Sequence, residues 1–288
     1  MNSYIICAWI GVFLLSMEEV MGKITSKHSL KNPWLMNFVW NGIIMLFTIP
    51  IAIANHVQWP TAWGNIIIAG LFYALSGIFY TWCIFLLDIS VLSPMFNFRT
   101  VFSVLLAAVV LHQFLQPWQY VLIGVIFVAG LFASYDEYEK LRSFFHKPIL
   151  IALIEMVIIS LYSVFTNKAI ADTGFWSTTM WIAIVSQVFI LLTWPKFQKD
   201  LRKINFTQIG SLSAMSVFGT TGMIAANYSY GGNVGIASTI MAIPFAMVIA
   251  LVFSIFAPTL LERHPVKIYV IRFTATAIMF VAAIRLSA

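Results

Sequence analysis

The stretch VLSPMFNFRTVFSVLLAAVVL, which runs from Val91 to Leu111, decides the fold class of this chain. Its 21 residues would form a helix of about 30 Å, the thickness of the hydrocarbon core of a bilayer. Arg99 lies inside it, although an arginine at the centre of a spanning helix costs at least about 2.5–3.5 kcal/mol unless a partner or a wet cavity receives it. The stretch therefore predicts a membrane-spanning helix with a polar feature in the protein interior.

The rest of the chain has a similar composition. Of its 288 residues, 61% are hydrophobic and 9% are charged, and the mean hydropathy is +0.94, whereas a soluble domain needs far more polar surface. A transmembrane barrel would instead show alternating segments of about ten residues. We expect an all-α integral membrane protein with ten transmembrane helices, the other nine being Tyr4–Gly22, Trp34–Ala54, Trp63–Leu87, Trp118–Tyr135, Ile149–Ile170, Trp176–Trp194, Ile209–Tyr230, Val234–Phe256 and Val266–Ile284.

Lysine and arginine are unevenly distributed between the two sides of the membrane if these helices alternate. One side carries Lys168 and Arg285, and the other carries twelve basic residues: Lys23, Lys27, Lys31, Lys140, Arg142, Lys147, Lys196, Lys199, Arg202, Lys203, Arg263 and Lys267. Cytoplasmic loops are enriched in Lys and Arg, so the rich side is predicted to be cytoplasmic and both termini are predicted to lie outside. Orientation in the cell (inner) membrane thus explains the net charge of +6, and no nucleic acid partner is expected.

Two halves of the chain show a similar pattern. Lys23 at the end of the first helix matches Lys168 at the end of the sixth with an offset of 145, and Pro117 matches Pro265 with an offset of 148. Because five is odd, two five-helix repeats must lie antiparallel across the bilayer, an arrangement found in transporters with the substrate site between the repeats. The alternative is that apolar helices resemble each other by composition alone. Duplication predicts three parts: a first repeat at 1–135, a polar connecting loop at 136–147, and a second repeat at 148–288.

Several short motifs resemble those of a known family. The segment SPMFNFRTVFSVLL (Ser93–Leu106), continuing to GVIFVAG (Gly124–Gly130), resembles the end of an EamA module, the unit of the ten-helix members of the drug/metabolite transporter superfamily. In the second half, IPF (Ile243–Phe245) and LLER (Leu260–Arg263) match the family's pattern of a proline, an aliphatic run and Glu-Arg. TNK (Thr166–Lys168) is similar to the amino-acid-exporting branch.

The resemblance implies a secondary active transporter that exports small metabolites, such as amino acids or amphipathic compounds, by alternating access of two inverted repeats. The chain departs from the family pattern at three positions: a proline near Thr100 and a glutamate near Gln113 are absent, and Arg272 replaces a glycine. The resemblance therefore leaves the substrate open. Many family members also have both termini in the cytoplasm, whereas the loop charges here predict the reverse.

Five charged residues lie within the predicted helices and in the same half of the bilayer: Glu18, Glu19, Arg99, Glu155 and Arg272. Glu19 or Glu155 is a candidate for proton coupling, because a carboxyl in a poorly solvated cavity is suited to take up and release protons. Arg99 or Arg272 is a candidate for holding a substrate carboxylate, because a guanidinium matches it with two donors. The alternative for each charge is an ion pair that only holds helices together.

Uncharged polar and aromatic residues extend this set. Asn97, Tyr162, Asn167, Asn227, Tyr228 and Tyr230 are candidates for the substrate or proton pathway, and Trp9, Trp40, Trp82 and Trp181 are candidates for the wall of a cavity. Asn97 and Arg99 point about 200° apart on a helix, so both cannot face one narrow pathway. The alternative for the polar groups is interhelical hydrogen bonding, worth about 0.6 kcal/mol each in membranes.

Other classes of function lack the residues that they need. No His-x-x-x-His metal site, Gly-x-Ser-x-Gly elbow or Gly-x-x-x-x-Gly-Lys phosphate loop occurs in the sequence, so we expect no enzyme, no catalytic or metal site, and no cofactor. A lipid-carrier flippase component and a non-transporting accessory membrane protein remain the alternatives. The expected partners are a small-molecule substrate, protons and the lipid bilayer, with the chain acting as a monomer or homodimer.

Overall fold

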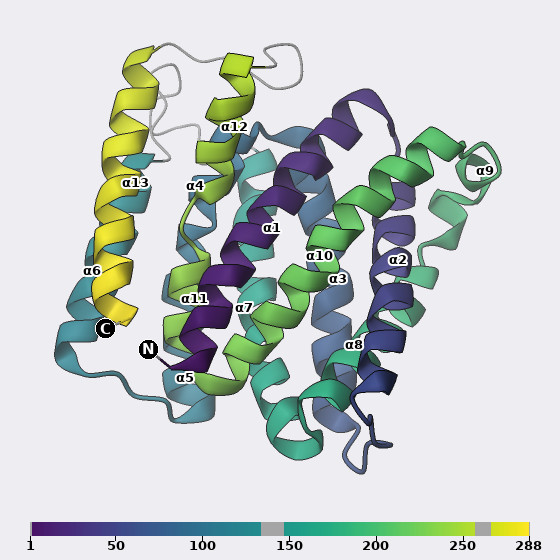
Figure 1. Ribbon diagram of the computed structural model, residues 1–288, viewed down its shortest axis with the longest axis horizontal. Helices are drawn as coiled ribbons and strands as arrows, with labels where there is room; N and C mark the ends of the chain where they lie inside the picture. The colour runs from purple at the N-terminus through teal and green to yellow at the C-terminus, as the bar shows by residue number, and fades with distance from the viewer. Residues whose placement is uncertain (1, 134–146, 257–265, 288) are drawn as a thin grey trace.

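The computed structural model describes residues 2–133, 147–256 and 266–287. Every element of regular structure within these ranges is helical, which confirms the expected all-helical class for them. The helices lie side by side in one array, with both termini at the same end (Figure 1). Their bounds are α1 Ser3–His28, α2 Pro33–Ala54, α3 Gly64–Leu86, α4 Ile89–Met95, α5 Asn97–Leu111, α6 Pro117–Ala133, α7 Lys147–Thr173, α8 Phe175–Leu191, the 3-10 helix η2 Trp194–Lys196, α9 Gln198–Leu201, α10 Phe206–Gly232, α11 Val234–Met241, α12 Phe245–Phe256 and α13 Val266–Ser287.

Seven of the described helical segments are long and apolar enough to cross a membrane: Ser3–His28, Pro33–Ala54, Gly64–Leu86, Val91–Leu111, Lys147–Thr173, Phe206–Gly232 and Val270–Ser287. Three shorter apolar helical segments accompany them: Pro117–Ala133, Phe175–Leu191 and Val234–Ala250. Large hydrophobic side chains remain exposed on the outside of the array, and those of Val109 and Val121 are 74% and 65% exposed. Water disfavours so much exposed apolar area, whereas lipid accommodates it, and the array therefore has the surface of a multi-pass membrane protein.

Two of the expected spans are each divided into two helices. Phe96 separates α4 from α5 two residues after Pro94, and residues 242–244 separate α11 from α12. Proline lacks a backbone N–H and disfavours a helical conformation of the preceding residue, so the division at Pro244 has a local cause. The sequence predicts one continuous helix at each place, because the segments on both sides of each division are apolar.

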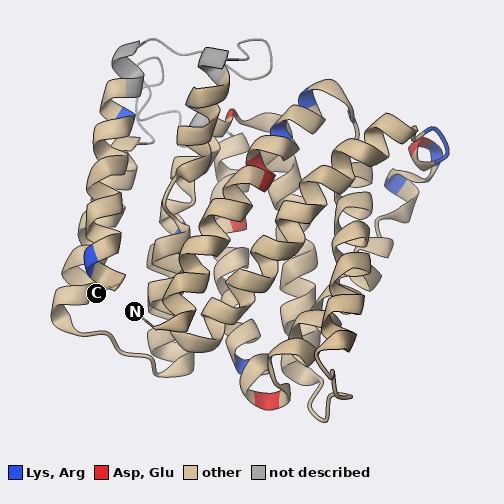
Figure 2. Cartoon of the chain, in the orientation of Figure 1, with Lys and Arg blue, Asp and Glu red and all other residues tan. Residues whose placement is uncertain are grey.

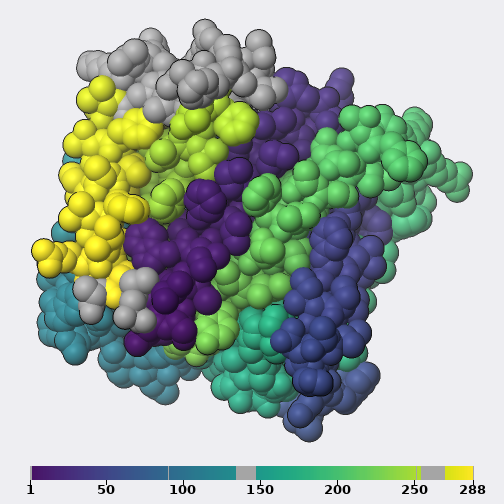
Figure 3. Space-filling model, in the orientation of Figure 1, coloured from purple at the N-terminus to yellow at the C-terminus, as the bar shows by residue number. Residues whose placement is uncertain are grey.

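The long helices pack in pairs. Helix α1 runs along α10 across the face seen in Figure 3, and α3 runs along α7. Helix α13 packs against α6 at the edge of the array, while α2 contacts both α8 and α10. Glycines permit close approach: a Cβ on Gly222 would lie 2.9 Å from Cδ2 of Leu15, and one on Gly70 would lie 2.6 Å from Cγ1 of Val185.

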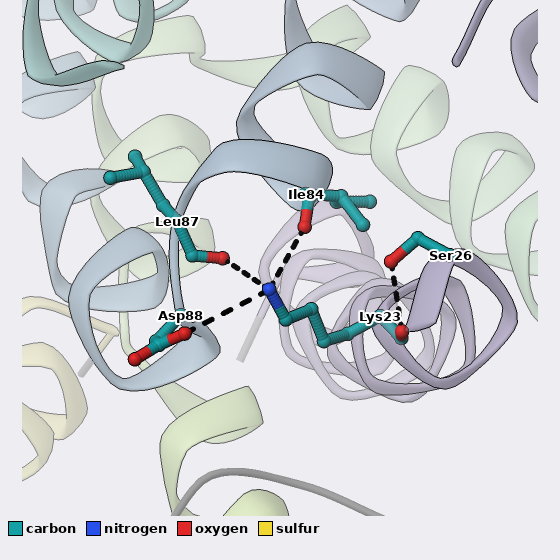
Figure 4. A network of polar contacts seen from close by, with 5 residues as sticks. All are labelled: Lys23, Ser26, Ile84, Leu87 and Asp88. Atoms are coloured by element: carbon teal, nitrogen blue, oxygen red, sulfur yellow. Dashed lines mark hydrogen bonds and ion pairs between the residues drawn. The ribbon is translucent and has the colours of Figure 1, made fainter. Parts of the chain in front are cut away.

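Lys23 joins α1 to the corner between α3 and α4 (Figure 4). Its Nζ donates to the carbonyl oxygens of Ile84 and Leu87 at 3.1 and 2.7 Å, and lies 3.9 Å from Oδ1 of Asp88. The last carbonyls of a helix have no partner within the helix and carry partial negative charge, so a cation at this position stabilises the end of α3. This contact anchors α1 at Lys23, one turn beyond Glu19.

Basic side chains gather at one end of the array. The α1–α2 connection and the segment from η2 to α9 both carry them, and both lie at the end opposite to the termini (Figures 1 and 2). These two segments are thus on one side, as the alternation of helices requires. Lys140, Arg142, Arg263, the LLER motif and residues 136–146 of the expected connecting loop lie outside the described residues.

Candidate functional site

A cavity of about 120 Å³ lies in the middle of the helix array. Helices α1, α2, α3, α7 and α10 contribute most of its wall, and both divided spans contribute as well, since Phe96 and Ile243 line it at the two divisions. A water molecule occupies about 30 Å³ in the liquid, so the space suits a few waters or one small solute. The cavity is therefore built where segments far apart in the sequence meet.

Three carboxyl groups line this cavity. The side chains of Glu18, Glu19 and Glu155 are only 4%, 5% and 1% exposed. Oε1 of Glu18 accepts a hydrogen bond of 2.7 Å from Nε1 of Trp40, and Oε1 of Glu155 accepts one of 2.7 Å from Oγ of Ser76. Oε1 of Glu19 and Oε2 of Glu155 have no hydrogen-bond partner among the described residues. Two buried acceptors on cavity-lining residues are therefore left without a protein donor.

Arg99 is the arginine on the cavity wall, and it is bound to a tyrosine rather than to these carboxyls. Its Nη2 donates to the hydroxyl of Tyr230, and the guanidinium carbon lies 5.5 Å from the centre of the Tyr230 ring. Within the described residues it forms no ion pair of 4.0 Å or less with a carboxylate. Within the part of the chain that the structure describes, no direct ion pair therefore accounts for the burial of Arg99 or Glu155.

Aromatic rings form much of the remaining wall. The Tyr73 and Tyr162 rings lie 5.1 Å apart, and the Trp40 and Tyr80 rings lie 5.7 Å apart, measured between centroids. The Tyr162 hydroxyl donates to Oδ1 of Asn227 at 2.5 Å, which holds that ring in place. Aromatic side chains present both an apolar face and a polar tip, so the wall suits a solute with a charged head and an apolar body.

The structure brings five of the predicted pathway residues together, since the cavity is lined by Glu19, Arg99, Glu155, Tyr162 and Tyr230. Asn227 supports the wall from behind through its bond to Tyr162. Of the four tryptophans proposed as cavity walls, Trp40 is on the lining, whereas Trp9, Trp82 and Trp181 are not.

Four further predicted residues, Asn97, Asn167, Arg272 and Tyr228, lie elsewhere. Nδ2 of Asn167 donates to the carbonyl oxygen of Tyr230 at 2.6 Å. Asn97 faces α6, where its Nδ2 donates to the carbonyl of Phe127 at 2.7 Å, as its separation of about 200° from Arg99 requires. Arg272 is fully buried on α13 and is not part of the cavity lining. Tyr228 is 41% exposed, with its hydroxyl 3.3 Å from that of Ser3.

Sequence reasoning missed several lining residues, among them Asn41, Tyr73, Ser76 and Tyr80. The last three lie at positions i, i+3 and i+7, so they share one face of α3. Such polar groups in the middle of an apolar helix are a usable signal, because hydrocarbon disfavours unpaired polar atoms. The signal identifies a face of one helix but not the helices opposite it.

Comparison with known proteins gives a likeness in fold alone. No protein-family model matches the chain, and no curated protein matches it. Twenty-eight chains among solved structures do match. One of them, described only as "Crystal structure of protein", is similar with a TM-score of 0.69 and 16% sequence identity, covering 99% of this chain and 99% of the other. The fold is thus one that a solved structure shares over its whole length.

Proposed function

We propose that this chain is a secondary active transporter that exports small metabolites, such as amino acids or amphipathic compounds, and that it resembles the EamA-type drug/metabolite transporters. The observation that carries the proposal is a cavity lined by the buried residues Glu18, Glu19, Glu155 and Arg99, inside an array with an apolar outer surface. Ionisable residues within membrane-spanning helices are costly and mark solute or proton pathways. A transporter gives these side chains a role that a passive membrane anchor does not.

The packing of the helices supports two inverted repeats. The first repeat would contain α1, α2, α3, α4–α5 and α6, and the second would contain α7, α8, α10, α11–α12 and α13. In this scheme α1 corresponds to α7 and α3 corresponds to α10, so the packed pair α1–α10 corresponds to the packed pair α7–α3. Seven long and three shorter apolar helical segments then account for ten spans. The pairs α6–α13 and α2–α8 each map onto themselves when the two repeats are exchanged.

The two helix divisions also correspond. Pro94 and Pro244 are 150 residues apart, close to the offsets of 145 and 148 between the other matched positions. Both divided spans reach the cavity, at Phe96 and at Ile243. Interrupted helices at corresponding positions of two repeats are a pointer to a substrate site. Rocking of one repeat against the other would then open the cavity first to one side of the membrane and then to the other.

Transport by purified protein in lipid vesicles tests the proposal. Vesicles are given a pH gradient and a panel of radiolabelled amino acids and amphipathic amines. We expect at least one solute to accumulate above the level in protein-free vesicles, and Glu155→Gln to reduce that accumulation. Asp172→Asn is the matched control, because its carboxylate lies outside the cavity and accepts a hydrogen bond of 2.7 Å from Asn65.

Accessibility of the cavity provides a test that needs no known substrate. Both variants are made in a background where Cys7 and Cys83 are replaced by serine. Ser16→Cys puts a thiol on the cavity wall, whereas Ser229→Cys puts one at a buried position of α10 outside the cavity. Alternating access predicts that an impermeant maleimide labels the Ser16→Cys thiol from both sides of a vesicle and leaves the Ser229→Cys thiol unlabelled. Equal and negligible labelling of both variants would indicate a non-transporting membrane protein.

A further inference from the structure

The ionisable groups on the cavity wall are unequal in number. Glu18, Glu19 and Glu155 face the space opposite one cation, Arg99, among the described residues that line it. Lys23 lies one turn beyond Glu19, but its ammonium group points to the carbonyls of Ile84 and Leu87 (Figure 4). A cavity with an excess of acidic groups attracts a cation, and like charges in a poorly solvated space favour binding of a positive ligand.

We propose that the cavity binds the primary ammonium group of a small organic cation between Glu19 and Glu155. This names the substrate class of the site described above and rests on the proposed transport function. The sequence points instead to a substrate carboxylate held by arginine, and the structure redirects that expectation, since Arg272 is not on the lining and Arg99 is bound to Tyr230.

The unpartnered carboxyl oxygens indicate a ligand with N–H donors. Glu19 and Glu155 line one cavity, and each has a buried oxygen, Oε1 and Oε2 respectively, with no hydrogen-bond partner among the described residues. A primary ammonium group has three donors and no acceptor, so it can serve both oxygens at once. A quaternary ammonium has the same charge but no N–H, and it would leave both acceptors unsatisfied.

The neighbouring contacts hold the carboxyls in position for this role. Trp40 donates to Glu18 and Ser76 donates to Glu155, each at 2.7 Å, so two of the three carboxyls are oriented by a protein donor. The rings of Tyr73, Tyr80 and Tyr162 also line the space. Aromatic faces attract ammonium groups, and side chains such as those of Val12, Leu15 and Ile159 offer an apolar surface to the body of the ligand.

Competitive binding with matched probes tests this inference on the purified, detergent-solubilised protein. Radiolabelled n-butylammonium is displaced by unlabelled n-butylammonium, tetramethylammonium, 1-butanol and propionate, which all have five non-hydrogen atoms, and by norvaline, which adds a carboxylate beside the ammonium. We expect n-butylammonium to bind at least about tenfold more tightly than each of the others, because only it combines a net positive charge with N–H donors.

Variants locate the site. Glu19→Gln and Glu155→Gln should each weaken n-butylammonium binding by about tenfold or more, because each removes a charge-assisted acceptor while preserving the shape of the side chain. Asp172→Asn makes the same chemical change outside the cavity and should leave binding unaltered.

Three results would overturn the inference: 1-butanol or tetramethylammonium binding as tightly as n-butylammonium, norvaline binding more tightly than n-butylammonium, or both Gln variants binding with the affinity of the original protein. The probe comparison on the unaltered protein decides the matter even where a variant fails to fold. Binding of n-butylammonium without transport of any solute would contradict the transporter proposal and leave this inference standing. Transport of other solutes without n-butylammonium binding would support the transporter proposal and overturn this inference.

Discussion

The cavity wall and the α6–α13 pair are both made of apolar membrane helices, yet polar side chains have different surroundings in the two regions. On the cavity wall, Glu19 and Glu155 each have a buried carboxyl oxygen with no hydrogen-bond partner among the described residues. Between α6 and α13, the contacts are made by apolar residues such as Ile126, Met279 and Ala283, and Arg272 is fully buried on the same helix away from the cavity. A charge within a membrane helix therefore does not by itself indicate a cavity.

Replacing Arg272 should lower the stability of the protein without changing ligand binding in the cavity. Arg272→Ala removes a large, fully buried side chain, and truncations of that size cost about 3 kcal/mol or more of unfolding free energy. The affinity for n-butylammonium per folded molecule should not change, because Arg272 is not on the cavity lining. Denaturation in detergent and displacement of the labelled amine measure the two quantities separately. A loss of affinity at unchanged stability would instead place α13 on the pathway.

Arg99→Gln is the counterpart on the cavity wall. It removes the positive charge that faces Glu18, Glu19 and Glu155, so n-butylammonium should bind several-fold more tightly. The same change deprives the Tyr230 hydroxyl of its charged donor, and some loss of stability should accompany it. Weaker amine binding in Arg99→Gln would show that Arg99 holds part of the ligand directly.

Hydropathy predicts the helices and buried charge predicts part of the cavity, and each prediction has its own physical reason. The long spans follow from the apolar stretches, because a spanning helix must be apolar over its whole length. Glu19, Arg99 and Glu155 stand out because charge is costly in hydrocarbon. Hydropathy does not give the direction in which a side chain points after the helices pack, so Arg272 and Glu155 look equivalent in the sequence although only Glu155 lines the cavity.

Uncharged lining residues and the helix divisions are harder to predict. Tyr73 and Tyr80 resemble ordinary aromatic residues of a packed helix, and their role depends on α1, α2 and α7 lying opposite them. Pro94 and Pro244 lie within apolar stretches, where membrane helices tolerate proline without ending. Only their matching positions in the two halves give these prolines predictive value.

Two glycines of α10 allow a sharper test of how closely the cavity wall is packed. A Cβ on Gly219 would collide with Oε1 of Glu18, whereas a Cβ on Gly210 would meet nothing within 4 Å. Alanine is the better helix former by about 1 kcal/mol, so Gly210→Ala should stabilise the protein, while Gly219→Ala should displace Glu18 from Trp40 and lose about 1 kcal/mol or more for the broken hydrogen bond. If the unfolding free energies of Gly210→Ala and Gly219→Ala differ by less than about 1 kcal/mol, Glu18 moves aside freely.

Ser76 provides the smallest and most local change on the cavity wall. Its hydroxyl donates to Oε1 of Glu155, and one such hydrogen bond is worth about 1 kcal/mol, or roughly a fivefold change in an equilibrium constant. Ser76→Ala should weaken n-butylammonium binding by about that factor, because the Glu155 carboxyl loses the donor that orients it. The control is Ser163→Ala on α7, where an equally buried hydroxyl donates to the carbonyl of Ser160 and does not reach the cavity. Equal effects of the two changes would mean that the Ser76 contact only packs α3 against α7, and that the orientation of Glu155 does not matter to the ligand.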